Sequence, residues 1–171
     1  MILTGSRITQ AVADGDIVID PFDESAVNPN SYNYRIGPTI RTYDEKVVDA
    51  HSPPATEEQT IPAGGLVLQP SRVYLATTKE VIGSDRFVPS LIGRSSLGRL
   101  GVFLQISADL GNLGAVHRWT LEITVCQPVH IVPDMIMGQV SFWVPRGERT
   151  PYKGYFGNFS TAVLPEANHF A

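Results

Sequence analysis

Short apolar runs recur along the whole chain, and glycine and proline separate most of them at intervals typical of an all-β domain. The 15 glycines and 13 prolines are scattered rather than concentrated in one linker. The pattern predicts one all-β barrel or sandwich. Its expected strands cover residues 17–19, 32–36, 39–43, 66–68, 73–77, 88–92, 102–107, 119–125, 129–131 and 139–144.

One segment near the N-terminus has helical spacing instead. In residues 5–14, the side chains of Ile8, Ala11 and Val12 fall on one face, and Gly15 can end the helix. A second, very short helix is expected at residues 97–100. The barrel should therefore carry one N-terminal helix and one short helical turn.

Two stretches break the apolar periodicity. Residues 49–62 are polar and contain prolines, so they are expected to form an exposed loop. From about Pro145 the periodicity is lost, and residues 145–171 are expected to form a flexible C-terminal tail. Tails of this kind often become lids over a site.

Composition narrows the class of protein. A chain of 171 residues with 43% hydrophobic content fits a single domain spanning residues 1–171 with a real core. The net charge of −4 gives no reason to expect nucleic-acid binding. The single cysteine, Cys126, excludes an internal disulfide and fits a reducing cytosol. No apolar run is long enough for a bilayer, so a cytoplasmic protein without a membrane partner is expected.

The stretch from Gly93 to Gly101 concentrates groups that bind phosphate. It reads Gly-Arg-Ser-Ser-Leu-Gly-Arg-Leu-Gly and so places two guanidinium groups and two hydroxyls among three glycines. Arginine grips phosphate oxygens bidentately, and glycine lets the backbone approach a ligand closely. The order of residues matches neither the P-loop nor the dinucleotide fingerprint. The stretch therefore predicts a polyphosphate site of a different type.

These motifs together resemble the dCTP deaminase branch of the dCTP deaminase/dUTPase superfamily. The resemblance is carried, in order, by residues 1–4 (MILT), 15–22 (GDIVIDPF), 30–37 (NSYNYRIG), 93–101 (GRSSLGRLG), 120–123 (TLEI) and 138–142 (GQVSF). It implies a distorted, jelly-roll-like β-barrel of the dUTPase type, assembled as a homotrimer with active sites between subunits. The implied reaction is hydrolysis of dCTP to dUTP and ammonia, which feeds dUMP and dTTP synthesis.

Glu122 is the candidate general base. It lies within a predicted strand between Leu121 and Ile123, so its side chain should point away from theirs. A carboxylate in a partly desolvated pocket has a raised pKa and can take a proton from water and return it. The alternative is a solvated glutamate on an outward strand face, which is the commoner fate of such a residue. The resemblance implies the catalytic role.

A zinc deaminase is excluded by the residues available. Zinc nucleobase deaminases need a His/Cys-x-Glu segment and a Pro-Cys-x-x-Cys segment. This chain has one cysteine, and its four histidines show no ligand spacing. The resemblance implies deamination without a metal ion held by the protein. We expect Mg²⁺ to be bound only through the triphosphate of the nucleotide.

The resemblance also assigns roles within the phosphate-type loop. Ser95 would orient the attacking water or the amino group of the ring, and Arg99 would organise the pocket beside Glu122. Arg94 and Ser96 would hold phosphate oxygens. The alternatives are surface salt bridges for the two arginines and a helix N-cap for the two serines.

The loop before Glu122 matches the family less closely. Ser107 and Ala108 correspond to a stretch whose backbone faces the pyrimidine. At equal spacing from Glu122, Asn112 takes the place of an aspartate that contacts the 3′-hydroxyl of deoxyribose, and that in the dUTP-hydrolysing branch helps to orient water. An amide can bond a hydroxyl but cannot act as a general base, so dUTP diphosphatase activity is disfavoured. Asp109 could compensate if the loop is remodelled.

The tail adds three candidate ligands for the triphosphate, which are Tyr152, Lys153 and Asn158, and the alternative for all three is a surface tail. Other functions of the same fold stay open at this point. They are action on another pyrimidine nucleotide, such as a ribonucleotide or monophosphate, and a non-catalytic nucleotide-binding trimer.

Overall fold

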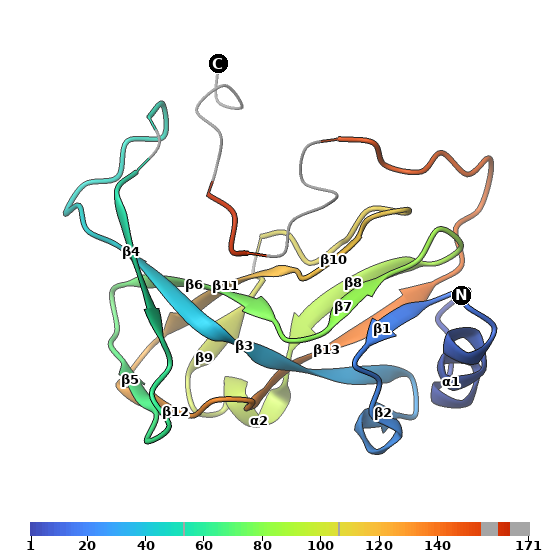
Figure 1. Cartoon of the computed structure of the whole chain (residues 1–171), viewed down its shortest axis with the longest axis horizontal. Coiled ribbons are helices and arrows are strands. Elements are labelled where there is room, and N and C mark those ends of the chain that lie inside the picture. The colour runs from blue at the N-terminus through green and yellow to red at the C-terminus, as the bar shows by residue number, and fades with distance from the viewer. Residues whose placement is uncertain (53, 106, 155–160, 165–171) are drawn as a thin grey trace.

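The computed structural model describes residues 1–52, 54–105, 107–154 and 161–164, and most of its regular secondary structure consists of antiparallel strands (Figure 1). Its elements are α1 (Gly5–Ala13), β1 (Val18–Asp20), η1 (Glu24–Ala26), β2 (Val27–Asn28), β3 (Ser31–Tyr43), β4 (Thr56–Thr60), β5 (Leu66–Leu68), β6 (Val73–Thr78), β7 (Val81–Gly83), β8 (Val88–Gly93), α2 (Ser95–Gly98), β9 (Val102–Leu104), β10 (Val116–His117), β11 (Thr120–Val125), β12 (Val129–Ile131) and β13 (Ile136–Trp143). Among the described residues, no helix has the length and apolarity needed to span a membrane.

The largest sheet curls into a nearly closed barrel. Its strands run in the order β8-β13-β3-β6-β11-β9, and β2 and β4 both pair with β3. The two edge strands meet, because a Cβ atom added at Gly93 on β8 would lie 3.5 Å from Cδ1 of Leu104 on β9. Smaller sheets, β1-β7-β10 and β12-β5, complete the domain. The expected mainly β barrel with a short N-terminal helix is therefore confirmed.

The long strand β3 replaces the two strands predicted at 32–36 and 39–43. The register between β3 and β6 shifts between Ile36 and Ile40, where Gly37 and Pro38 lie. A Cβ atom at position 37 would approach Oγ1 of Thr77 to 2.5 Å, so only glycine fits there. Pro38 is exposed and cannot donate to the ladder. The Gly-Pro pair therefore marks an irregularity within one strand rather than a turn between two.

Alternation along β11 fixes the direction of each side chain on that strand. Leu121 and Ile123 are completely buried in the core, and burial of each contributes roughly 1.5–3 kcal/mol. A slip of one residue would exchange the buried and outward faces, so this burial holds the register strongly. Glu122, between them, consequently points to the outer face of the sheet, as predicted.

The helix α1 agrees with the prediction to within one residue. Ile8 and Ala11 are completely buried against the barrel. Gly15 follows the helix with a φ of 76°, a left-handed conformation that glycine adopts without strain. The amphipathic spacing and the terminating glycine thus both have the roles expected from the sequence.

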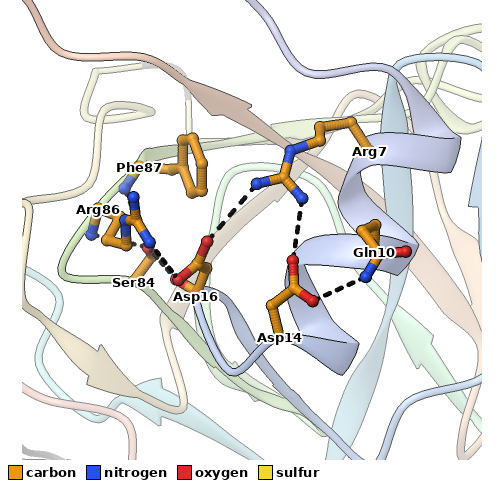
Figure 2. Close-up of polar contacts among 7 residues, drawn as sticks. All are labelled: Arg7, Gln10, Asp14, Asp16, Ser84, Arg86 and Phe87. Carbon is orange, nitrogen blue, oxygen red and sulfur yellow. Dashed lines mark hydrogen bonds and ion pairs between the residues drawn. The ribbon is translucent and has the colours of Figure 1, made fainter.

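An ion-pair network fastens α1 to the loop after β7 (Figure 2). The carboxylate of Asp16 pairs with Nη1 of Arg86 at 2.7 Å and with Nη2 of Arg7 at 3.5 Å. Arg7 also pairs with Asp14, the residue that ends α1. The hydroxyl of Ser84 donates to the backbone carbonyl of Asp16. Asp16 is therefore the shared centre that connects the helix to the β-barrel.

The prediction of an exposed loop over 49–62 is wrong in part, because residues 56–60 form β4 along the edge of β3. Four of its five residues are exposed, so no apolar alternation marks the strand. Cross-strand pairing stabilises it instead, including an ion pair between Arg41 and Glu58. The short strands β2, β7 and β10 were not predicted either.

Candidate functional site

Glu122 lies exposed on the outer face of β11. Its Cα is opposite that of Leu75 on β6, and Arg41 on β3 is opposite Leu75 in turn. Partial burial raises the pKa of the Glu122 carboxyl above its ordinary value of 4.5. Among the described residues, no side chain donates a hydrogen bond to this carboxyl. The carboxyl is thus free to accept a hydrogen bond from a ligand or from water.

Tyr43, at the end of β3, lies near this carboxylate. Burial raises the pKa of the Tyr43 phenol, and the negative charge of Glu122 raises it further. Tyr43 is a residue that the sequence analysis missed as part of the site.

Gln105 supports the strand that carries Glu122, and the sequence analysis missed this residue as well. Its side-chain oxygen accepts a hydrogen bond from the backbone N–H of Glu122 at 2.7 Å. Its side-chain nitrogen donates to the carbonyl of Thr120 at 3.0 Å. The backbone of Gln105 has a φ of 50°, which ends β9 at Leu104 rather than at the predicted residue 107.

The phosphate-type loop forms the end of β8 and the short helix α2. The helix begins at Ser95, and Arg94 is its N-cap residue without a side-chain capping bond, so neither serine is the N-cap. Ser95, Ser96 and Arg99 are exposed and Arg94 is half-buried. Within the described ranges, none of these four side chains makes a hydrogen bond or ion pair with another residue. Two guanidinium groups and two hydroxyls are therefore available to an anionic ligand.

The structure of one chain does not join this loop to Glu122. The loop and β11 are linked through β9. Gly93, just before the loop, lies against Leu104 of β9, and Leu104 pairs with Ile123 of β11. However, Leu104 and Ile123 point inward, whereas Glu122 points outward. No hydrogen bond or ion pair connects Glu122 with Ser95 or Arg99 in the part of the chain that is described.

The segment from Ser107 to Asn112 forms an exposed loop attached to β8. Ser107, Ala108 and Asn112 are exposed. The backbone carbonyl of Asp109 accepts the N–H of Leu91 at 2.8 Å, and its carboxylate accepts the hydroxyl of Ser90 at 3.1 Å. Asp109 is therefore already engaged with β8 through one carboxylate oxygen. Residue 106 lies outside the described residues.

The C-terminal segment after Pro145 contacts the loop after Asn112 and the start of β11. The backbone N–H of Tyr152 donates to the carbonyl of Leu113 at 2.7 Å, directly after Asn112. The N–H of Val163 donates to Oγ1 of Thr120 at 3.1 Å, two residues before Glu122 on the same strand. Tyr152 is half-buried and Lys153 is exposed. The predicted ligand Asn158 lies outside the described residues.

Comparison with known proteins identifies the family of this chain. The family model described as "dCTP deaminase-like" matches residues 2–144. The chain is 41% identical over 152 residues to a protein of Clostridium acetobutylicum named "dCTP deaminase, dUMP-forming", covering 89% of this chain and 87% of the relative. It is 45% identical over 148 residues to a protein of Rhodopirellula baltica named "dCTP deaminase", covering 86% of this chain and 74% of the relative.

A solved structure agrees on the fold. The crystal structure of 2′-deoxycytidine 5′-triphosphate deaminase from Agrobacterium tumefaciens superimposes with a TM-score of 0.67 at 20% sequence identity. The match covers 84% of this chain and 46% of that longer chain. It confirms the barrel that the resemblance implied. The family model, the two relatives and the order of the motifs lead to one conclusion: the chain belongs to the dCTP deaminase family.

Proposed function

We propose that the protein hydrolyses dCTP at C4 of the cytosine ring to give dUTP and ammonia. The Glu122 carboxylate takes a proton from water, the resulting hydroxide attacks C4, and the proton passes to the departing amino group. The observation that carries this proposal is the Glu122 carboxyl on the outer face of β11, unpartnered among the described residues, in a member of this family. Desolvation raises the pKa of this carboxyl, which helps a group that must both accept and return a proton.

The phosphate-type loop supplies the remaining chemistry. Ser95 orients the attacking water or the amino group of the ring, and Arg99 organises the pocket beside Glu122. Arg94 and Ser96 hold phosphate oxygens. The exposure of these side chains and the free guanidinium groups described above support this assignment.

We place the complete site between subunits of a homotrimer. In one chain the unpartnered carboxyl of Glu122 lies on the outer face of the sheet, and nothing described connects it with Ser95 or Arg99. A loop from a neighbouring copy would bring those side chains to the carboxyl. This arrangement supports a trimer whose isolated subunits have incomplete sites.

The nucleotide is held from both ends in this proposal. The backbone of Ser107 and Ala108 reads the pyrimidine, and the amide of Asn112 bonds the sugar hydroxyl. Tyr152, Lys153 and Asn158 reach the triphosphate when the segment 145–171 closes as a lid on the single domain. Contacts of this segment with Leu113 and Thr120 support such a position.

Magnesium belongs to the substrate in this scheme. Within the described ranges, no three His, Cys, Asp or Glu side chains gather into a group that could hold a metal ion. Mg²⁺ accordingly enters on the triphosphate, where it neutralises charge. We place the enzyme in the cytoplasm, for which the lone Cys126 is the supporting feature.

A second candidate function is release of dUMP rather than dUTP. The Clostridium acetobutylicum relative carries the name "dCTP deaminase, dUMP-forming". That outcome requires a second water to attack the triphosphate of dUTP and release diphosphate. Asn112 cannot act as the base for this step, and Asp109 is the carboxylate that lies in the same loop.

A parallel assay separates the candidates. The purified protein with Mg²⁺ is offered dCTP, CTP, dCMP, CMP and dUTP, and ammonia, dUTP, dUMP and diphosphate are measured. Ammonia from dCTP with equal dUTP supports the first function, and dUMP with equal diphosphate supports the second. Ammonia from another cytosine nucleotide in preference to dCTP, or from none, would contradict the proposal.

A further inference from the structure

The ladder between β9 and β11 ends beside Glu122 in an unusual way. Leu104 pairs with Ile123, so the next pair in register would join Gln105 with Glu122. Gln105 instead adopts a φ of 50°, and its backbone N–H donates a long hydrogen bond to the carbonyl of Glu122, with 3.4 Å between nitrogen and oxygen. The regular ladder of β9 ends here, but one backbone bond to Glu122 is kept.

The side chain of Gln105 adds two further hydrogen bonds to β11 at this point. Its oxygen accepts the N–H of Glu122 and its nitrogen donates to the carbonyl of Thr120, so one amide holds the backbone on both sides of Leu121. Gln105 is only 8% exposed, which shields both bonds from competing water. The segment of β11 that carries Glu122 is thus held mainly by a side chain just beyond the end of β9 at Leu104.

The same residue directs the chain into the loop that contains Ser107 and Ala108. A left-handed backbone is uncommon for a residue with a long side chain and persists where the surroundings fix it. Here the two amide bonds provide that fixation. Gln105 is therefore tied both to the start of this loop and to one side of β11, while β6 pairs with the other side of β11.

Glu122 is sensitive to such support. Its carboxyl has no side-chain donor among the described residues, so its position depends on the backbone of β11 and on packing. A displacement of about 1 Å in a catalytic group can reduce turnover about 100-fold. Small movements of residues 120–122 should therefore affect chemistry more than nucleotide binding.

We infer that Gln105 is a positioning residue for the reaction: its amide fixes the β11 backbone that carries Glu122 and the start of the loop at Ser107 and Ala108. The inference rests on the proposed function, because it acts through Glu122. It assigns to Gln105 no contact with the nucleotide.

Two variants and one control test this inference. Gln105→Met keeps the length of the side chain and removes both hydrogen bonds. Gln105→Asn keeps an amide and tolerates the left-handed backbone but is one methylene shorter. Gln59→Met, on the exposed strand β4, is the matched control. Each protein is measured for thermal unfolding, dCTP binding, kcat, KM and the pH dependence of kcat.

For both Gln105 variants we expect kcat to fall about 100-fold while KM changes less than about threefold. The acidic limb of the kcat profile should also move to lower pH, because a loosened Glu122 becomes more exposed to water. The control should match the unmodified protein in all five measurements. A folded Gln105→Met protein with an unchanged kcat and pH profile would overturn the inference. So would loss of folding in both variants, which would make the role purely structural.

Glu122→Gln separates failure of the inference from failure of the proposed function. If the unmodified protein releases no ammonia from dCTP, or if Glu122→Gln is fully active, the proposed function itself fails. If the unmodified protein is active, Glu122→Gln is inactive and the Gln105 variants behave as the unmodified protein does, only the inference about Gln105 fails.

Discussion

The phenol of Tyr43 on β3 lies near enough to the Glu122 carboxylate on β11 for the charge of Glu122 to raise the pKa of Tyr43. Leu75 on the intervening strand β6 is 5% exposed, so an apolar surface separates the two strands on this face. The carboxylate therefore has protein on the side of β6 and β3, while Glu122 itself remains exposed. This setting gives Glu122 the raised pKa on which its proposed role depends.

The pH dependence of deamination should reflect that environment. Glu122 must be ionised to accept a proton from water, and burial raises the pKa of its carboxyl above 4.5. The acidic limb of kcat/KM for dCTP should therefore fall above pH 4.5, with activity lost as the pH decreases through the raised pKa. A profile of kcat/KM against pH measures this directly. A limb at or below pH 4.5 would show that the carboxyl is fully solvated in the working enzyme.

The Asp16 network should contribute to stability without affecting chemistry. Asp16→Asn removes the charge shared by Arg7 and Arg86, and we expect the free energy of unfolding to fall by about 1 kcal/mol, because both arginines are partly exposed. Denaturant unfolding measures the loss, which should shrink at high salt. Asp85→Asn, on the exposed loop beside Arg86, is the control. A loss equal in both variants would contradict the structural role given to Asp16.

His117 should make stability depend on pH. Its Nδ1 donates to the carbonyl of Arg118, and its buried Nε2 has no hydrogen-bond partner among the described residues. Burial lowers the pKa of His117 below 6.5, so the unfolded chain binds a proton more readily than the folded protein. The folded state is favoured above pH 6.5 and loses stability as the pH falls from 6.5 towards the lowered value.

The variant His117→Gln removes this titration and tests its sign. Unfolding free energies of both proteins are measured at intervals from pH 7.5 to pH 5.5, a range chosen to span about one unit on either side of the ordinary histidine pKa. The unmodified protein should lose more stability than the variant over this range. Parallel curves would mean that His117 titrates in the folded protein as it does in water.

Asn112 provides a test of sugar recognition. The residue is exposed in the loop between Asp109 and Leu113, where the proposal places the sugar hydroxyl. An ionised carboxylate accepts a hydrogen bond from a hydroxyl more strongly than a neutral amide does. Asn112→Asp should therefore bind dCTP more tightly, by roughly threefold to tenfold, and should gain nothing for 2′,3′-dideoxy-CTP, which lacks the 3′-hydroxyl. Equilibrium binding of both nucleotides to both proteins measures this, and an equal change for the two nucleotides would remove Asn112 from the sugar site.

The sequence alone was sufficient for elements with a strong local signal. The helix α1 could be predicted from the spacing of Ile8 and Ala11 and from Gly15, and the outward direction of Glu122 from alternation along one strand. Motif order was sufficient for the family. Each of these features depends on neighbours within a few residues or on a pattern that the whole chain preserves.

Features that depend on pairing between strands distant in the sequence could not be predicted from local patterns. The strand β4 has no apolar face, and it exists because β3 supplies its partners. The left-handed backbone of Gln105 could not be predicted from the sequence, since this conformation is expected mainly at glycine and asparagine. The approach of Tyr43 to Glu122 depends on three strands lying side by side, which no local pattern encodes.

The most direct test of the account is ammonia release from dCTP by the unmodified protein and by Glu122→Gln, with dCTP binding measured in parallel. The account predicts rapid release by the first, a loss of at least about 100-fold in the second, and similar affinities for the nucleotide. Equal rates of ammonia release by the two proteins would contradict the assignment of Glu122 as the proton-transferring group.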